Sequence, residues 1–413
     1  MSQTRVCDIV AFQYIFMPPQ GGGMEIIMTR SLYCGRGSHI PYADYMDLIN
    51  LSFGFTTPET QFLGLLPKLY KEEYRPQDQN YVVTEDGVLT TAVGAYDHEI
   101  SVCGHRLACR GIGNVAVHPD HRSKGYMKDA MNAALQDMIK DGIVLSTLGG
   151  RRQRYLYFGY DKAGSLYNFH VSRDNIRHVY GDLTAPFTVR EVTTPADPVI
   201  DSMVALNEAS PVNPLRPRDR DLDIANSWKA KLLAILDGAR FVGYCVLVGG
   251  KSVSEIQTVS DGEFMSAIRS LYAFIGEGFG VNLPAHQFSY RRDITPIAEG
   301  MSLGHAMHFN ILNYRAAVEA FLDLKLQYES LPDGSVVLLI HGYAGDERIR
   351  VSVKNGEGGV ESVDTAEPAD YELTHPEAIS FLFSPISPLR EAANDLCKLW
   401  FPLPICMAHA DEV

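Results

Sequence analysis

The spacing of hydrophobic and polar positions between residues 24 and 160 predicts a mixture of helices and strands. Some segments carry apolar residues at helical spacing, and others are short β-branched runs bounded by turn residues. In chain order these patterns predict helices at 42–52 and 61–74, a hairpin of strands 81–84 and 88–92, strands at 103–109 and around Val115, a helix at 124–140 and a strand at 143–148. This order is typical of a mixed α/β domain.

A weaker copy of the same plan occupies residues 161–300, and a different pattern begins near residue 301. The copy predicts strands at 241–248 and 251–258, a helix at 263–276 and a strand at 279–283. The last part predicts helices at 314–324, 376–382 and 389–398, and strands at 335–341 and 348–353 with a hairpin turn at 355–356. The Pro-rich stretch 211–220 fits an exposed loop over a substrate site and fits a plain connection equally well.

Length and composition agree with several globular domains. The chain has 413 residues, of which 46% are hydrophobic and 21% charged, enough for sizeable cores. No apolar run reaches the roughly 18 residues of a membrane span, so we expect no membrane partner. The formal net charge of −14, without a long basic tract, argues against a nucleic-acid partner and suits a cationic small substrate.

The cysteines and the N-terminal segment bear on the cell compartment. Seven scattered cysteines form no C-x-x-C pair and no zinc spacing, which predicts reduced thiols in the cytoplasm and no metal. His118 and His121 are likewise not expected to hold a metal. Residues 1–23, which contain Pro18-Pro19 and a run of glycines, make a poor signal peptide. We expect them to be a disordered extension or the product of an upstream start codon.

The segment from Asn114 to Met127 carries the most informative chemistry. A short β-branched strand passes through a proline turn into a basic loop that opens directly into a helix. Unpaired N–H groups at a helix N-terminus lie at the positive end of the helix dipole and bind phosphate oxygens. Gly125 would let the backbone approach a pyrophosphate, and Arg122 and Lys124 would add charge-assisted hydrogen bonds. The same pattern also fits an ordinary turn with a solvated basic rim.

Two motifs connect this chain with a known family. Arg122-x-x-Gly125-x-Met127, after a strand ending in Val-His-Pro, resembles the acetyl-CoA loop of the GCN5-related N-acetyltransferases (GNAT). The downstream run Arg154-Tyr-Leu-Tyr-Phe-Gly-Tyr160 resembles the tyrosine-bearing segment of the Eis-type (enhanced intracellular survival) branch. The last loop position is usually Gly or Ala in the wider superfamily. The Eis-type branch tolerates a larger apolar residue there, as Met127 is here.

The resemblance implies tandem GNAT-like domains, at 24–160 and 161–300, followed by a sterol-carrier-like α+β domain at 301–413. Acetyl-CoA would be the cosubstrate, without a metal, and the protein would be a homo-oligomer, by resemblance a hexamer. The second domain lacks the Arg-x-x-Gly loop and is not expected to bind acetyl-CoA.

The resemblance also implies which residues contact acetyl-CoA. The strand would lie along the pantetheine arm, where the N–H of Val115 or a neighbour would polarise the thioester carbonyl, and the loop would hold the pyrophosphate. The expected contacts are Val115, Ala116, Val117, Arg122, Ser123, Lys124, Gly125, Tyr126, Met127, Lys128, Gly150 and Arg151. Arg151, Arg152 and Arg154 would bind the 3′-phosphate, form a solvated face, or pair with an acidic tail of a neighbouring subunit.

Acetyl transfer to an amine needs a neutral attacking amine, a donor for the oxyanion and a proton for the departing thiolate. The resemblance assigns Tyr155 as the general acid and the terminal carboxylate, here that of Val413, as the base. A phenol of ordinary pKa near 10 matches a thiol of similar basicity. Tyr157 is a rival that would share the same face in an extended segment. Because the family usually ends in an aromatic residue, Val413 also fits a free tail, with Asp411 and Glu412 as acidic surroundings.

The expected function is acetyl-CoA-dependent acetylation of primary amines by direct attack in a ternary complex. An acidic cleft between the two acetyltransferase-like halves would favour aminoglycosides, polyamines or lysine side chains as acceptors. Two alternatives stay open. In the first, the C-terminal domain binds a lipid or sterol and the chain is a carrier. In the second, the chain senses acetyl-CoA with a vestigial transferase domain.

Overall fold

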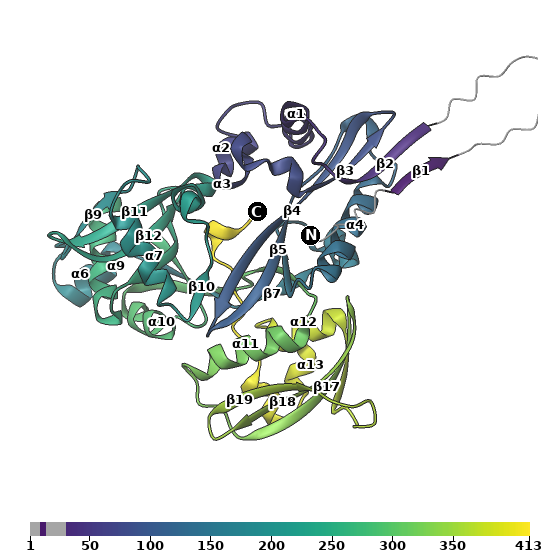
Figure 1. Cartoon of the computed structure of the whole chain (residues 1–413). Helices are drawn as coiled ribbons and strands as arrows, with labels where there is room; N and C mark the ends of the chain where they lie inside the picture. Colours follow the sequence, from purple (N-terminus) through teal and green to yellow (C-terminus); the bar gives the residue numbers. More distant parts are fainter. Residues whose placement is uncertain (1–8, 14–29) are drawn as a thin grey trace, which may run out of the picture.

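The computed structural model describes residues 9–13 and 30–413, and these residues form three β-sheets with helices packed on them (Figure 1). The three sheets follow one another along the chain, except that residues 161–163, 212–214 and 307–311 add strands to the first sheet. The predicted extension 1–23 lies outside the described residues except for β1 (Ile9–Gln13), which pairs antiparallel with β2 (Arg30–Arg36). Among the described residues, no helix has the length and apolar character needed to cross a membrane.

The first sheet has the strand order β1-β2-β3-β4-β5-β6-β16-β7, and β10 pairs with the far end of β4. Its remaining strands are β3 (Asn80–Glu85), β4 (Val88–Val102), β5 (His105–Val117), β6 (Leu145–Leu148), β7 (Asp161–Ala163), β10 (Val212–Pro214) and β16 (Met307–Ile311). The helices of this part are α1 (Tyr42–Phe53), α2 (Phe62–Leu65), α3 (Pro67–Tyr70), α4 (Tyr126–Lys140) and α5 (Arg152–Tyr155).

Several predictions for residues 24–160 differ from the structure, among them the strand 88–92, which extends to Val102 as β4. The expected helix 61–74 is broken into short pieces, because Pro67 has no N–H to continue the first of them. The separate strands expected at 103–109 and around Val115 are one long strand, β5, which runs through the glycines at 111 and 113. Helix α4 begins at Tyr126 because Gly125, at φ 89°, takes the left-handed conformation before it.

Strand β5 separates from its parallel neighbour β6 partway along its length. Pairing runs from Cys109 with Leu145 to Ile112 with Leu148, and there it stops. A bulge follows at once, because the register of β5 against β4 shifts around Asn114, whose φ is 34°. Beyond the bulge, no strand among the described residues pairs with this side of β5. The end of β5 and the loop after it therefore border an open space.

The second sheet has the order β15-β8-β14-β13-β12-β11-β9. In chain order its strands are β8 (Leu166–Val171), β9 (Thr188–Glu191), β11 (Ala230–Asp237), β12 (Arg240–Val248), β13 (Ser252–Thr258), β14 (Phe279–Pro284) and β15 (Ala298–Gly304). The helices are α6 (Arg173–Tyr180), α7 (Val199–Glu208), α8 (Asp221–Ala225), α9 (Phe264–Ile275) and α10 (Phe288–Ile294). The four elements that the sequence predicts here are confirmed as β12, β13, α9 and β14, with small shifts at their ends.

The third sheet has the order β19-β18-β17-β20. Its strands are β17 (Gly334–Gly342), β18 (Gly345–Lys354), β19 (Glu357–Ser362) and β20 (Tyr371–Thr374), and its helices are α11 (Tyr314–Leu326), α12 (His375–Phe383), α13 (Pro388–Glu391) and α14 (Asp395–Trp400). Phe321, Phe383 and Trp400 fill its core, together with apolar residues from the far ends of β4 and β5.

Short strands and the C-terminal tail join the parts. β16 follows the second sheet in the chain but inserts between β6 and β7 of the first sheet, and β10 leaves the second domain to pair with β4. The Pro-rich stretch 211–220 is therefore partly a sheet strand and not wholly an exposed loop. The C-terminus lies at the centre of the molecule, between the first and second sheets (Figure 1).

Candidate active site

The loop before α4 has the backbone conformation of an anion-binding turn. Ser123 and Gly125 both have positive φ, 66° and 89°, and the first turn of α4 follows directly. Such a run directs successive N–H groups into one concavity at the positive end of the helix dipole. The concavity is part of a cavity of about 600 Å³, lined by Ser52, Phe53, Val115, Val117, His121, Arg122, Ser123, Lys124, Gly125, Tyr126, Met127, Lys128 and Arg154.

The two cations of this loop differ in their contacts: Lys124 forms an ion pair, whereas Arg122 forms none with the residues that the structure describes. Lys124 Nζ lies 2.7 Å from Glu85 Oε2, and His121 Nδ1 lies 2.9 Å from the same atom. The Lys124 ammonium is the main cause that holds the pKa of Glu85 below its ordinary value. Arg122 is exposed, and no ion pair with it occurs among the described residues. Of the two cations predicted to bind phosphate, Arg122 is thus the one available without breaking an existing pair.

The open side of β5 presents backbone donors to the same cavity. The His118 N–H donates to Thr90 O of β4 at 2.8 Å. Because N–H directions alternate along a strand, the N–H groups of Val115 and Val117 point away from β4, toward the open space. Both residues line the cavity, whereas the Ala116 side chain is buried on the opposite side with Tyr45 and Tyr96. Ala116 is therefore the one predicted strand contact whose side chain faces away.

The tyrosine segment is helical, which separates its two candidate acids. Tyr155 ends α5 and is buried, whereas Tyr157 lies in the following 3-10 turn and is 63% exposed. The two tyrosines would share a face only in an extended segment, and here a helical turn rotates alternate residues apart. Burial raises the pKa of the Tyr155 phenol above its ordinary value, while the adjacent Arg154 guanidinium opposes the shift.

Residues from distant parts of the chain hold the tyrosine segment 154–160 in place through hydrogen bonds. His375 Nε2 lies 2.9 Å from Gly159 O, and Asn310 Nδ2 donates to Phe158 O at 3.0 Å. Tyr160 is fully buried, and its hydroxyl lies 2.6 Å from Ser146 Oγ. Three elements remote in sequence, β6, β16 and α12, thus fix the turn that presents Tyr155.

Tyr155 and Val413 line one cavity of about 590 Å³ that also contains Gly150, Arg151 and Arg154. This cavity shares Val115, Phe53 and Arg154 with the cavity at the α4 loop. The candidate general acid, the chain terminus and the candidate phosphate loop are therefore brought together, although they lie far apart in sequence. The ring of Tyr155 packs on Gly150, where an added Cβ would lie 2.5 Å from the ring.

Two glycines of β5 make room for the C-terminal residue, and the sequence analysis did not assign them this role. A Cβ on Gly111 would lie 2.5 Å from Cγ2 of Val413, and one on Gly113 would lie 3.4 Å from its carboxyl carbon. Residues two apart in a strand face the same way, so these glycines form one bare face. The signal in the sequence is Gly-x-Gly between the strands predicted at 103–109 and around Val115, which the structure shows to be one strand.

Comparison with known proteins agrees with this geometry. Residues 41–163 match the acetyltransferase (GNAT) domain family. A comparison with curated proteins gives no sequence match. The segment that carries the α4 loop and Tyr155 is thus similar to an acetyltransferase (GNAT) domain.

Several solved structures are similar in fold to nearly the whole chain. A GCN5-related N-acetyltransferase from Kribbella flavida is 17% identical over 93% of this chain and 99% of its own, with a TM-score of 0.64. Another from Anabaena variabilis ATCC 29413 is 14% identical over 91% and 98%, also at 0.64. Eis1 from Mycobacterium abscessus is 14% identical over 92% and 98%, at 0.58. At these identities the likeness concerns the fold.

Gly125 offers a direct test of the loop. Gly125→Ala should weaken acetyl-CoA binding by about tenfold, since a left-handed φ costs a non-glycine residue roughly 1–2 kcal/mol and the loop would relax. Calorimetric titration with acetyl-CoA measures this change. Gly300→Ala is the matched control, because Gly300 has ordinary φ and open space around its Cβ position. Equal affinity of both variants and wild type would contradict the assignment of the loop.

Proposed function

We propose that this enzyme transfers the acetyl group of acetyl-CoA to a primary amine, using Tyr155 as acid and the Val413 carboxylate as base. The observation that carries the proposal is that Tyr155 and the chain terminus line the same cavity, directly beside the α4 loop. The loop fits the phosphates of acetyl-CoA, because it combines N–H donors of a helix N-terminus with the cation of Arg122. We infer that Lys128, Tyr126 and Met127 border the same group from the first turn of α4.

The chemical roles follow from the positions of the groups. The acceptor reacts as the neutral amine, and the Val413 carboxylate takes the proton that the nitrogen loses as its new bond to the acetyl carbon forms. The outward N–H of Val115 donates to the carbonyl oxygen as charge develops on it. As the carbon–sulfur bond breaks, the Tyr155 phenol donates its proton to the sulfur. The raised pKa of Tyr155 keeps that phenol protonated at neutral pH.

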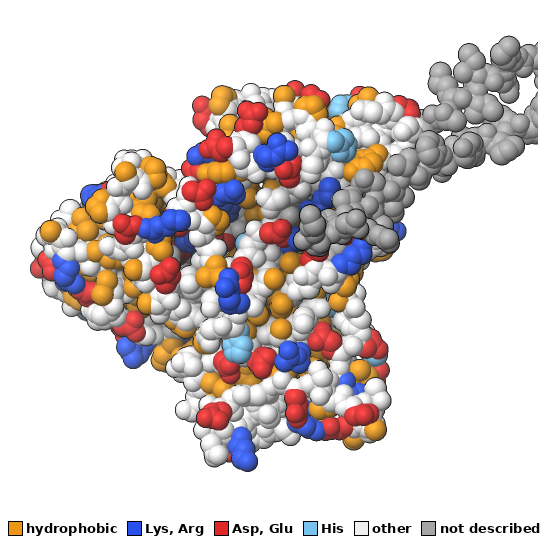
Figure 2. Space-filling model, in the orientation of Figure 1, with side chains coloured by type: hydrophobic (Ala, Val, Ile, Leu, Met, Phe, Trp, Pro, Cys, Tyr) orange, Lys and Arg blue, Asp and Glu red, His pale blue; other side chains and the backbone are white. Residues whose placement is uncertain are grey.

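The walls of the cavity bear on the class of acceptor. Its lining includes the apolar and aromatic side chains of Phe62, Leu66, Trp228 and Met307, together with the cations of Arg151 and Arg154. Its one acidic side chain, Glu412, is paired, since Glu412 Oε2 lies 3.0 Å from His409 Nδ1. On the face shown in Figure 2, acidic and basic side chains are interspersed. These features favour an amine with one positive charge on an apolar or aromatic body over a polycation.

Thiol release from acetyl-CoA, measured over a panel of amines, tests both the proposed acetyl transfer and the proposed class of acceptor. The panel contains a phenylalkylamine, a short alkylamine, a polyamine, an aminoglycoside and a lysine peptide. We expect amine-dependent release, with kcat/KM for the phenylalkylamine at least about tenfold above that of the polyamine, which corresponds to about 1.4 kcal/mol. A higher value for a polycation would overturn the acceptor class alone. Tight acetyl-CoA binding with no release for any amine would overturn the enzymatic proposal and leave a sensor.

A further inference from the structure

The last residues of the chain are held by a buried lysine of the first domain. Lys68, in α3, is 4% exposed, and its Nζ donates to Ala410 O at 2.5 Å and to Glu412 O at 2.6 Å. Burial lowers the pKa of Lys68 to about 8, so the ammonium stays mostly protonated at neutral pH. The Trp228 indole N–H also donates to Glu412 O, at 3.3 Å. The backbone on the N-terminal side of Val413 is thus fixed by side-chain donors.

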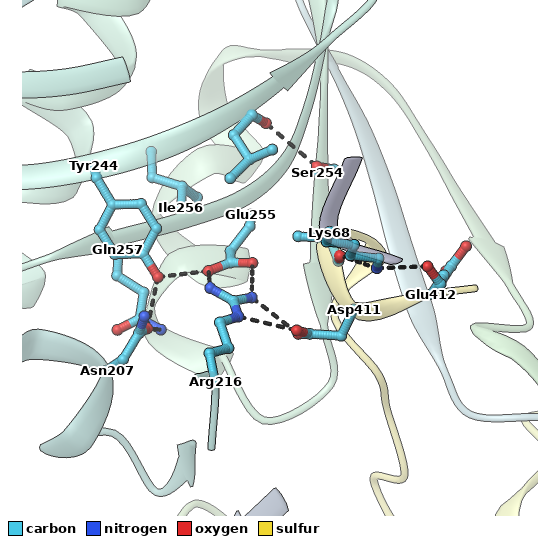
Figure 3. Close-up of polar contacts among 12 residues, drawn as sticks. Lys68, Asn207, Arg216, Tyr244, Ser254, Glu255, Ile256, Gln257, Asp411 and Glu412 are labelled. Atoms are coloured by element: carbon cyan, nitrogen blue, oxygen red, sulfur yellow. Dashed lines mark hydrogen bonds and ion pairs between the residues drawn. The ribbon is translucent and has the colours of Figure 1, made fainter. Parts of the chain in front are cut away.

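A second buried cation holds the tail from the side of the second domain (Figure 3). Arg216 donates to both oxygens of Asp411, from Nε at 3.0 Å and from Nη2 at 2.9 Å. Its Nη2 also lies 2.8 Å from Glu255 Oε2 of β13. The three side chains are between 5% and 11% exposed. Burial alone would raise the pKa of Asp411, but Arg216 outweighs it and holds this pKa below its ordinary value.

Glu255 is itself fixed, so the arginine is anchored on a rigid element. The Tyr244 hydroxyl, on β12, lies 2.5 Å from Glu255 Oε1 and 2.6 Å from Asn207 Oδ1. Gln257 Nε2 donates to the same Asn207 oxygen at 2.9 Å. Figure 3 shows this chain of contacts running from the second sheet to Asp411. A displacement of Asp411 would therefore break a connected network of buried polar groups, which is costly.

Lys68 and Arg216 bind residues 410–412 but do not pair with the terminal carboxylate of Val413. Lys68 and Arg216 bind Ala410, Asp411 and Glu412, and within the described residues no cation forms an ion pair with the Val413 carboxylate. An ion pair on that carboxylate would stabilise its charged form and weaken it as a base. The arrangement therefore fixes the position of the terminal carboxylate without neutralising it.

We propose that Lys68 and Arg216 are positioning residues that clamp residues 410–412 and so place the Val413 carboxylate in the cavity with Tyr155. This inference rests on the proposed function for its kinetic consequence, but not for the position of the tail. A misplacement of about 1 Å at a reacting group lowers the rate by about 10²-fold. The clamp thus couples two domains to one catalytic group.

The kinetic test compares the same substitutions in the natural chain and in a chain extended by two glycines after Val413. Lys68→Met, which keeps the length of the side chain, and Asp411→Asn should each lower kcat by about 10²-fold in the natural chain while the KM for acetyl-CoA stays within about twofold. In a chain extended by two glycines after Val413, the same substitutions should change kcat by less than about twofold, because the carboxylate is already misplaced. Lys71→Met is the matched control, since Lys71 pairs with Asp223 and not with the tail. Equal losses in both backgrounds would overturn the clamp.

A second measurement does not depend on turnover. Carboxypeptidase should release Val413 from Lys68→Met and from Asp411→Asn at least about tenfold faster than from wild type or Lys71→Met, because the tail is no longer held. Equal release rates would overturn the clamp even if the enzyme is active. Faster release together with no acetyl transfer to any amine would uphold the clamp and reject the proposed function.

Discussion

Tyr155→Phe should lower kcat for acetyl transfer by about 10²- to 10⁴-fold, the usual contribution of a positioned general acid. The substitution removes only the hydroxyl, so the ring still packs on Gly150 and the turn is kept. The KM for acetyl-CoA should stay within about twofold, because the α4 loop is untouched. Steady-state thiol release over a range of acetyl-CoA concentrations measures both constants.

Tyr157→Phe is the control for this result, because Tyr157 is the rival in the same motif and its ring is exposed. The phenyl ring keeps the contact with the Lys128 ammonium, which lies 4.7 Å from the ring centre of Tyr157. We expect kcat near that of wild type. A large loss in Tyr157→Phe with none in Tyr155→Phe would reject our assignment of the acid. Since the pKa of Tyr155 is raised, loss of the Tyr155 proton should not lower the wild-type kcat until above about pH 10.

Adding two glycines after Val413 should have a similarly large effect, a loss of about 10²- to 10⁴-fold in kcat, because the base is moved or lost. The bare face formed by Gly111 and Gly113 accommodates one C-terminal residue closely, so a longer chain cannot keep its carboxylate there. The affinity for acetyl-CoA should be retained. Thiol release and calorimetric titration on the same preparation separate these two effects.

Val413→Ala is the matched control for the extended chain. It keeps the terminal carboxylate at the same position and removes only methyl groups from the contact with Gly111. We expect kcat within about tenfold of wild type, since the lost packing amounts to about 1 kcal/mol. If Val413→Ala were as impaired as the extended chain, the side chain and not the carboxylate would be the important group.

The parts of the fold that follow from local patterns could be predicted from the sequence. The hairpin around Asp86-Gly87 is confirmed, because both residues adopt positive φ, 52° and 79°, as an Asp-Gly turn requires. Helices α1 and α4 are confirmed because their apolar spacing extends over several turns. Glycine was the ambiguous signal, since it marks loops and also close approach inside a strand.

The contacts that assemble the candidate site could not be predicted in the same way. Lys68, Arg216 and Trp228 stand in unremarkable local sequence, and only the packing of three domains brings them to the tail. A buried lysine or arginine has no period or motif that distinguishes it from an exposed one. The spacing to Phe158-Gly159-Tyr160 favours Tyr155 over Tyr157, but whether this short aromatic segment is extended or helical could not be decided from its length.

The most direct test of the central claim is a structure of the protein in complex with coenzyme A. We predict that the pyrophosphate lies against the N–H groups of residues 123–128 and that the sulfur lies within hydrogen-bond reach of the Tyr155 hydroxyl, about 3–3.5 Å. The Val413 carboxylate should line the space beyond the sulfur, where the acceptor amine would enter. A pyrophosphate bound elsewhere, or a sulfur remote from Tyr155 and Val413, would contradict the account.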